Sequence, residues 1–156
     1  MRILGVDPGS RAAGWAVVSF EGPPRLVAAG VLRPPTTTSF ALRLLALHDG
    51  LLAIAERERP DEAAVEQVFS GVNPQSLITL GEARGVLLLA LAHASIPVSE
   101  VTPAEIKKTV TGTGQADKEQ VRRMVHSLLG TPAGGPRLAL DAADAAAAAL
   151  THGFRT

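Results

Sequence analysis

The beginning of this chain is apolar on both faces of a predicted strand and ends in an acidic residue. Residues 2–7 read Arg-Ile-Leu-Gly-Val-Asp, and Pro8, Gly9 and Ser10 follow with the chemistry of a turn. A strand with consecutive apolar side chains is typical of the centre of a sheet that helices cover on both sides. The sequence therefore predicts a layered α/β fold in which Asp7 ends a central strand.

The rest of the chain predicts four more strands and five helices. The second and third strands follow through short turns, which indicates an antiparallel meander. Helices separate the third, fourth and fifth strands, which indicates a parallel half of the same sheet. We therefore expect the α/β class, with a five-stranded mixed sheet flanked by helices. The predicted strands are 2–7, 14–18, 25–32, 63–68 and 97–101, and the predicted helices are roughly 39–59, 74–94, 103–111, 118–129 and 138–152.

The length of 156 residues suits one domain, which we expect to span 1–156. Cysteine is absent, which excludes disulfides, thiolate zinc sites and cysteine nucleophiles. The N-terminus lacks the basic and apolar pattern of a secretory signal. The longest strongly apolar run, 86–92, has seven residues, whereas a membrane span needs about 20. We therefore expect a cytoplasmic protein.

Four acidic residues stand in apolar surroundings. Asp7 and Glu66 interrupt the first and fourth strands, while Asp141 and Asp144 lie one turn apart in an alanine-rich helix. An acid in such a place must be paired, bind a metal or open onto a site. Singly, each has a plainer interpretation: a turn residue for Asp7, an ion pair with arginine for Glu66, and solvated helix residues for the other two. Together, four oxygen donors suit Mg²⁺ or Mn²⁺, and two such ions can promote phosphoryl transfer.

Several motifs, in order along nearly the whole chain, resemble one known family. The resemblance is to the RuvC family of crossover-junction endodeoxyribonucleases. The motifs that carry it are Gly5–Ser10 with Gly14–Val17, Val65–Phe69, Asn73 with Leu80–Gly85, Val110–Gly114 with Ala116–Val121, and Asp141–Ala145 with Leu150–His152.

The resemblance implies a ribonuclease H-like fold and a homodimer that cuts four-way DNA junctions during recombination and repair. It also implies two Mg²⁺ ions in each active site, with Mn²⁺ as a substitute, and products that carry a 5′-phosphate. A branch-migration helicase is the further partner that it suggests. In the family pattern Asp7, Glu66, Asp141 and Asp144 match the metal ligands. Phe69 matches an aromatic residue that stacks on bases at the crossover, and Lys107 and Lys118 match basic residues near the DNA.

The charge of the chain is unevenly distributed. The formal net charge is zero, which by itself argues against a nucleic-acid partner. Residues 107–137, however, hold six basic residues against two acidic ones, and we expect Arg122 in this segment to contact DNA together with Lys107 and Lys118. Elsewhere, Gly81 and Gly85 permit close packing of a helix, either on the sheet or at a dimer contact. The four histidines have no metal-ligand spacing along the chain.

The sequence leaves three other functions to be considered. One alternative is a different ribonuclease H-like nuclease that acts on RNA or RNA–DNA hybrids. Another is a DNA-binding module without catalysis, against which the four acids argue. A third is an actin-like nucleotide-binding protein, for which this chain is too short.

Overall fold

Five strands form one mixed sheet in the computed structural model, which describes residues 1–67, 73–131 and 137–156. The strand order is β3-β2-β1-β4-β5, with β1 antiparallel to β2 and parallel to β4. β2 pairs antiparallel with β3, and β4 pairs parallel with β5. The predicted meander and the parallel half are both confirmed. The strands are β1 (Arg2–Asp7), β2 (Ala13–Ser19), β3 (Arg25–Leu32), β4 (Glu62–Glu66) and β5 (Val98–Val101).

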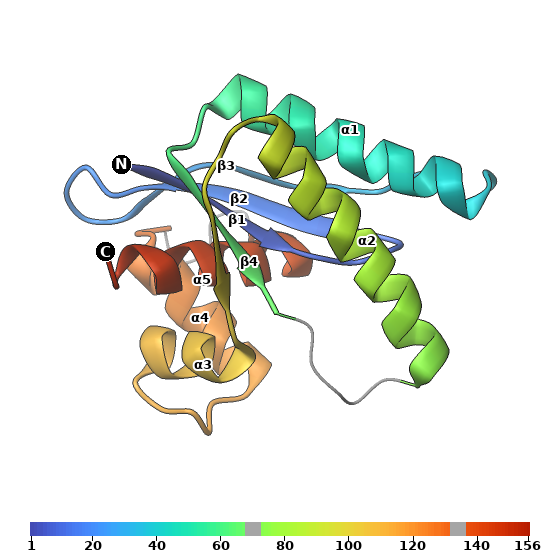
Figure 1. The fold of residues 1–156 in the computed structure, drawn as a ribbon. Coiled ribbons are helices and arrows are strands. Elements are labelled where there is room, and N and C mark those ends of the chain that lie inside the picture. Colours follow the sequence, from blue (N-terminus) through green and yellow to red (C-terminus); the bar gives the residue numbers. More distant parts are fainter. Residues whose placement is uncertain (68–72, 132–136) are drawn as a thin grey trace.

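Helices cover both faces of the sheet (Figure 1). α1 (Phe40–Glu58) and α2 (Pro74–His93) lie on one face and share a core with the side chains of Leu4, Val6 and Val17. The opposite face carries α3 (Pro103–Thr111), α4 (Lys118–Leu128) and α5 (Leu140–Gly153). Because β1 lies at the centre, its side chains from Ile3 to Val6 are fully buried, as its apolar sequence predicted.

The helix boundaries follow local capping chemistry. The side chain of Ser39 accepts a hydrogen bond at the start of α1, and Thr102 and Asp117 form complete capping boxes on α3 and α4. Two predicted boundaries were wrong by a few residues. β4 ends at Glu66, before residues 68–72, which are not described, and α5 begins at Leu140 because Ala139 has an extended backbone (ψ 147°).

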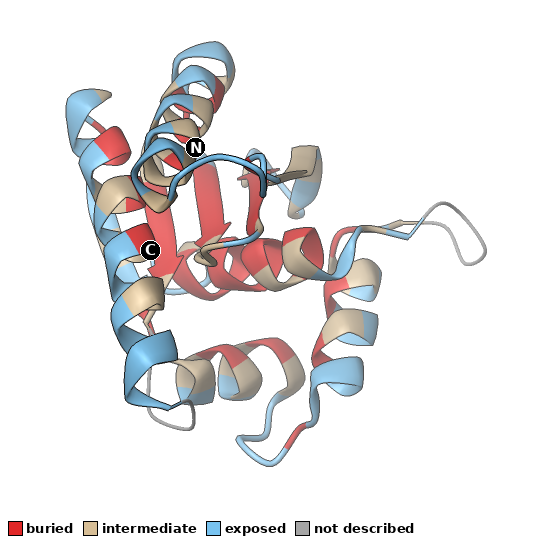
Figure 2. Ribbon diagram, turned by 90° about the vertical axis from the view of Figure 1, so that its right-hand side faces the viewer, coloured by how far each residue is buried: buried red, intermediate tan, exposed pale blue. Residues whose placement is uncertain are grey.

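α5 packs unusually close to the sheet. Its face is built from buried alanines, and Figure 2 shows most of this helix as buried beneath the strands. Two glycines make the approach possible: a Cβ on Gly5 would lie 1.9 Å from the carbonyl oxygen of Ala145, and one on Gly14 would lie 1.9 Å from that of Asp141. The central strands therefore touch the backbone of α5 directly, and this contact sets the position of its acidic first turn.

A further contact holds the other end of α5. His152 is buried, with 8% of the residue exposed, and its Nε2 lies 2.5 Å from Oε2 of Glu62 at the start of β4. α5 is therefore anchored to the sheet at its C-terminus by a polar contact and at its N-terminus by glycine packing.

α2 is long and apolar enough to cross a membrane by length and composition, with a mean hydropathy of 1.3. A single helix of this kind is weak evidence for a membrane protein, because helices of soluble proteins meet the same criteria. One side of α2 packs against α1 through Leu87 and Leu91, and its other side carries the exposed side chains of Ile78 and Leu89.

Candidate metal centre and nucleic-acid interface

Two of the predicted acids lie at the same edge of the sheet. Asp7 ends β1 and Glu66 ends β4, and the two strands are parallel neighbours in a register that pairs Val6 with Val65. Equivalent ends of parallel neighbours meet at one edge. The strand topology therefore places the two carboxylates side by side.

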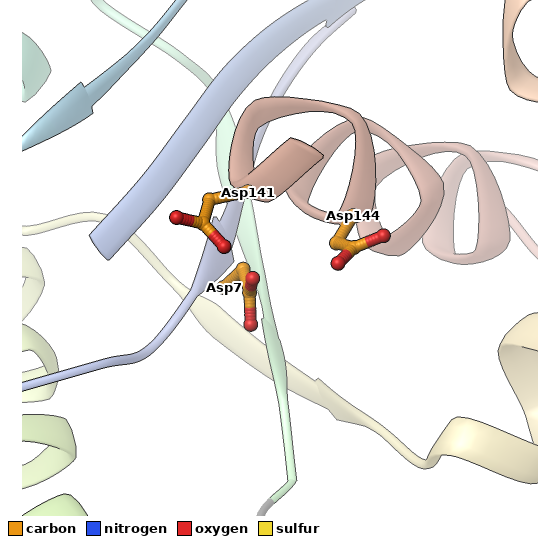
Figure 3. Close-up of side chains that lie close together, drawn as sticks. All are labelled: Asp7, Asp141 and Asp144. Atoms are coloured by element: carbon orange, nitrogen blue, oxygen red, sulfur yellow. The ribbon is translucent and has the colours of Figure 1, made fainter. Parts of the chain in front are cut away.

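α5 brings two more carboxylates to this edge. Asp141 and Asp144 lie in its first two turns, and one carboxylate oxygen from each lies within 4.8 Å of the others and of one from Asp7. Figure 3 shows the three side chains converging from the end of β1 and the start of α5. Gly14 permits this geometry, because any side chain there would displace Asp141.

Burial and neighbouring charges raise the pKa of two of these acids. Burial, followed by the charges of Glu66, Asp144 and Asp141, raises the pKa of Asp7 to about 8. Burial and the nearby Asp144 likewise raise the pKa of Glu66, while Lys118 acts in the opposite direction on both groups. Without a bound cation, Asp7 and Glu66 therefore resist ionisation at neutral pH.

A cavity of about 460 Å³ opens beside these acids. Asp7, Glu66 and Asp144 line it together with Lys107 from α3 and Lys118 from the first turn of α4. The predicted acids and both predicted lysines thus lie close together, although they belong to five different elements.

Arg122 contacts one of the predicted acids. Its guanidinium donates from Nε and Nη2 to the two oxygens of Asp144, at 3.3 and 3.2 Å, and only 17% of its side chain is exposed. The structure thus brings Arg122 into the acidic site. This ion pair had no signal in the sequence, because 22 residues separate its members.

The remaining predicted residue, Phe69, lies outside the described residues.

The predicted acids divide between the cluster and the cavity. Asp141 belongs to the three-carboxylate cluster with Asp7 and Asp144, whereas Glu66 lines the cavity beside Asp7 and Asp144. The sequence analysis did not predict the contacts of Gly5 and Gly14 with α5. The small alanine side chains of this helix are the signal that could have indicated them.

The chemistry of this cluster fits a divalent metal. All of its donors are carboxylate oxygens, the ligands that Mg²⁺ and Mn²⁺ prefer, and cysteine is absent from the chain. Burial first and the neighbouring carboxylates second raise the pKa of Asp7, and a bound cation would offset both effects. The cluster is therefore able to bind metal.

The raised pKa of Asp7 predicts how stability depends on pH without metal. The folded state holds the Asp7 proton up to about pH 8, whereas an unfolded aspartate loses it near pH 3.8. Protonation of Asp7 therefore stabilises the folded state. This contribution is complete below about pH 4 and is lost as the pH rises through about 8. In EDTA, we expect the free energy of unfolding, measured with urea, to fall between pH 5 and pH 8.

Asp7→Asn isolates this effect, because asparagine does not titrate. Its fall in stability over the same range should be clearly smaller than that of the parent protein. Glu21→Gln, at an exposed turn, should leave the profile of the parent unchanged. Parallel profiles for the parent and Asp7→Asn would show that Asp7 is ionised in the metal-free fold.

Comparisons with known proteins agree on one family. Residues 3–152 match the family model described as crossover junction endodeoxyribonuclease RuvC. The protein of that name from Chloroflexus aurantiacus is 50% identical over 155 residues, covering 99% of this chain and 93% of its relative. Its counterpart from Azorhizobium caulinodans is 48% identical over 154 residues, covering 97% and 89%.

Solved structures give the same result for the fold. T. thermophilus RuvC in complex with Holliday junction substrate superposes with a TM-score of 0.91 at 34% identity, covering 99% of this chain and 94% of the other. The yeast mitochondrial Holliday junction resolvase Ydc2 shares the fold with a TM-score of 0.62 at 13% identity, covering 96% and 75%. The predicted ribonuclease H-like fold is confirmed.

Proposed function

Because this chain belongs to the RuvC family of crossover junction endodeoxyribonucleases, we propose that it resolves four-way (Holliday) DNA junctions in recombination and repair. It does so by nicking two opposed strands symmetrically. One observation carries the proposal: a single cavity holds acids suited to metal, Asp7, Glu66 and Asp144, beside Lys107 and Lys118. Hydrolysis of a DNA phosphodiester needs both, since carboxylates hold metal ions and lysines bind phosphates.

Two Mg²⁺ ions are the cofactor that suits this acidic cluster, with Mn²⁺ as a substitute. We assign Asp7, Glu66, Asp141 and Asp144 as their ligands. Bound there, the ions would supply activation of water and stabilisation of the charge that develops on the phosphate. The chain itself holds the carboxylates in place, and Lys118 favours the ionised forms of Asp7 and Glu66. The products carry a 5′-phosphate and a 3′-hydroxyl, which a ligase can reseal.

The basic residues divide into two roles. Lys107 and Lys118, which line the cavity, bind the DNA backbone near the scissile phosphate. Arg122, paired with Asp144, orients that carboxylate and also contacts DNA. Phe69 stacks on bases at the crossover, as the family pattern implies. Junction shape and deformability then provide most of the specificity.

The exposed side of α2 supports a homodimer. Ile78, Gly81, Gly85 and Leu89 follow one another at helical spacing, and Ile78 and Leu89 are 56% and 50% exposed. A Cβ on either glycine would meet nothing within 4 Å, so the glycines do not serve packing on the sheet. We assign this stripe to the contact with a second copy, whose symmetry presents two active sites to two opposed strands.

Gly85→Arg tests this dimer contact. A long charged side chain at the centre of the stripe would be buried against the apolar surface of the partner, which is unfavourable. We expect the variant to be a folded monomer at micromolar concentration, whereas the parent is a dimer, as measured by analytical ultracentrifugation. Gly114→Arg, at an exposed turn with no atom within 4 Å of a Cβ, should remain dimeric. A dimeric Gly85→Arg would place the interface elsewhere.

We place the enzyme in the cytoplasm, where a branch-migration helicase is the partner that the family suggests. The helicase would bring junctions to the dimer.

A cleavage assay with three substrates tests the proposed activity. The dimer is incubated with a synthetic four-way junction, a linear duplex of the same sequence, or an RNA–DNA hybrid, in Mg²⁺ or in EDTA. We expect paired symmetric nicks in the junction only, and only with Mg²⁺. Comparable cutting of the hybrid would contradict junction resolution and favour an enzyme that acts on RNA. Binding of the junction without cutting in any metal would leave a DNA-binding module.

A further inference from the structure

Two histidines that are far apart in the sequence meet where α1 packs against α2. Nε2 of His48 lies 3.0 Å from Nδ1 of His93, with the two rings edge to face and their centroids 5.2 Å apart. His93 lies in the last turn of α2, thirteen residues beyond Leu80 of the acidic cavity, which corresponds to about 20 Å along the helix. This histidine pair is therefore separate from the proposed active site.

A carboxylate orients the first of these rings. Oδ1 of Asp49 lies 2.9 Å from Nδ1 of His48. A carboxylate only accepts hydrogen bonds, so Nδ1 of His48 carries the proton and its Nε2 directs a lone pair toward His93. Metal-binding histidines are typically held in this way, with a carboxylate on the ring nitrogen that does not face the metal.

We propose that His48 and His93 form a site for a divalent transition metal such as Zn²⁺, with Nε2 of His48 and Nδ1 of His93 as ligands. Zinc–nitrogen bonds of about 2.0–2.1 Å in a tetrahedral site separate two nitrogens by about 3.3 Å. The observed 3.0 Å needs an adjustment of only a few tenths of an ångström, and the exposed His93 is able to make it. Water completes the coordination.

Metal binding at the histidine pair requires no net gain or loss of protons by the two rings. Without metal, Nδ1 of His93 carries its proton and donates to Nε2 of His48. On binding, the proton of His93 moves through solvent to its own Nε2, which frees Nδ1 for the metal. Asp49 keeps His48 in the same tautomer throughout.

This site and the acidic site prefer different metals. Imidazole suits Zn²⁺, whereas Mg²⁺ prefers oxygen ligands. A metal at the histidine pair would also join α1 to α2, the helix that carries the exposed stripe, and would stabilise the folded state by mass action.

The test is calorimetric titration of the full chain with Zn²⁺ in excess Mg²⁺, which occupies the carboxylates. We expect one Zn²⁺ per chain with micromolar affinity and a higher Tm. His48→Gln and His93→Gln should each weaken binding about a hundredfold, since each removes a ligand, and Asp49→Asn should weaken it by about tenfold. His126→Gln, on α4, is the matched control and should bind as the parent does.

Two results would overturn the site. One is Zn²⁺ binding that is unchanged in both His48→Gln and His93→Gln; the other is affinity in the parent no tighter than millimolar. Because His93 is exposed, its variant should fold, and circular dichroism checks this before titration. Junction cleavage in Mg²⁺ serves as a separate readout: we expect His93→Gln to retain it, so failure of the zinc site and failure of the proposed function are distinguishable.

Discussion

Asp7→Asn should abolish junction cleavage and leave junction binding nearly unchanged. Asparagine has almost the shape of aspartate, but it removes a negative charge from the centre of the carboxylate cluster. Metal binding depends on that charge, whereas DNA binding depends on basic residues such as Lys107 and Lys118. We expect the single-turnover cleavage rate to fall by at least about a thousandfold, because stabilisation of the reacting phosphate is lost.

The measurement separates binding from chemistry. Cleavage is followed at saturating protein in Mg²⁺, so that a change in affinity does not alter the rate, and binding is measured by gel shift in EDTA. Glu21→Gln removes an acid at an exposed turn and should cut at the parent rate. A normal rate for Asp7→Asn would show that the metal assignment is wrong.

Gly5→Ala should destabilise the fold by about 3 kcal/mol or more, at the upper end of the usual cost of overpacking. The added Cβ would lie 1.9 Å from the carbonyl oxygen of Ala145 and 3.0 Å from the amide nitrogen of Ala149. Both atoms are backbone, so no side chain can move aside and β1 must separate from α5. For a chain of this length, we expect Tm to fall by roughly 10 °C.

Urea unfolding and thermal melts measure this effect. Gly114→Ala is the matched control, because a Cβ there meets nothing within 4 Å and the residue is exposed. Its stability should stay within about 0.5 kcal/mol of the parent. If Gly5→Ala were as stable as the control, α5 would not be held against β1 as the structure describes.

Local sequence patterns were sufficient to predict most of the strands and helices of this protein. The apolar run at the N-terminus identified the central strand, and Thr102 and Asp117 marked the starts of their helices correctly. Such signals are local, because strand periodicity and helix capping depend on residues within one or two turns. The ends of β4 and α5 were less accurate, since strand pairing and tertiary packing decide where those elements begin and end.

Only part of the candidate site could be predicted from local sequence patterns. Its acids were identified because each interrupts apolar sequence, and the i, i+3 spacing of Asp141 and Asp144 placed them on one helix face. That they face Asp7 depends on contact between α5 and β1, which are more than 130 residues apart in the chain. Spacing alone contains no information about such a distant contact.

The sequence by itself therefore determined the order of the elements, the acids that interrupt them and the resemblance to one family. Only the tertiary structure decided which side chains share a site. It paired Arg122 with Asp144, placed His48 against His93, and left the stripe around Gly81 and Gly85 exposed. The physical reason is that secondary structure follows from neighbours along the chain, whereas a site is made by packing between segments that the sequence keeps far apart.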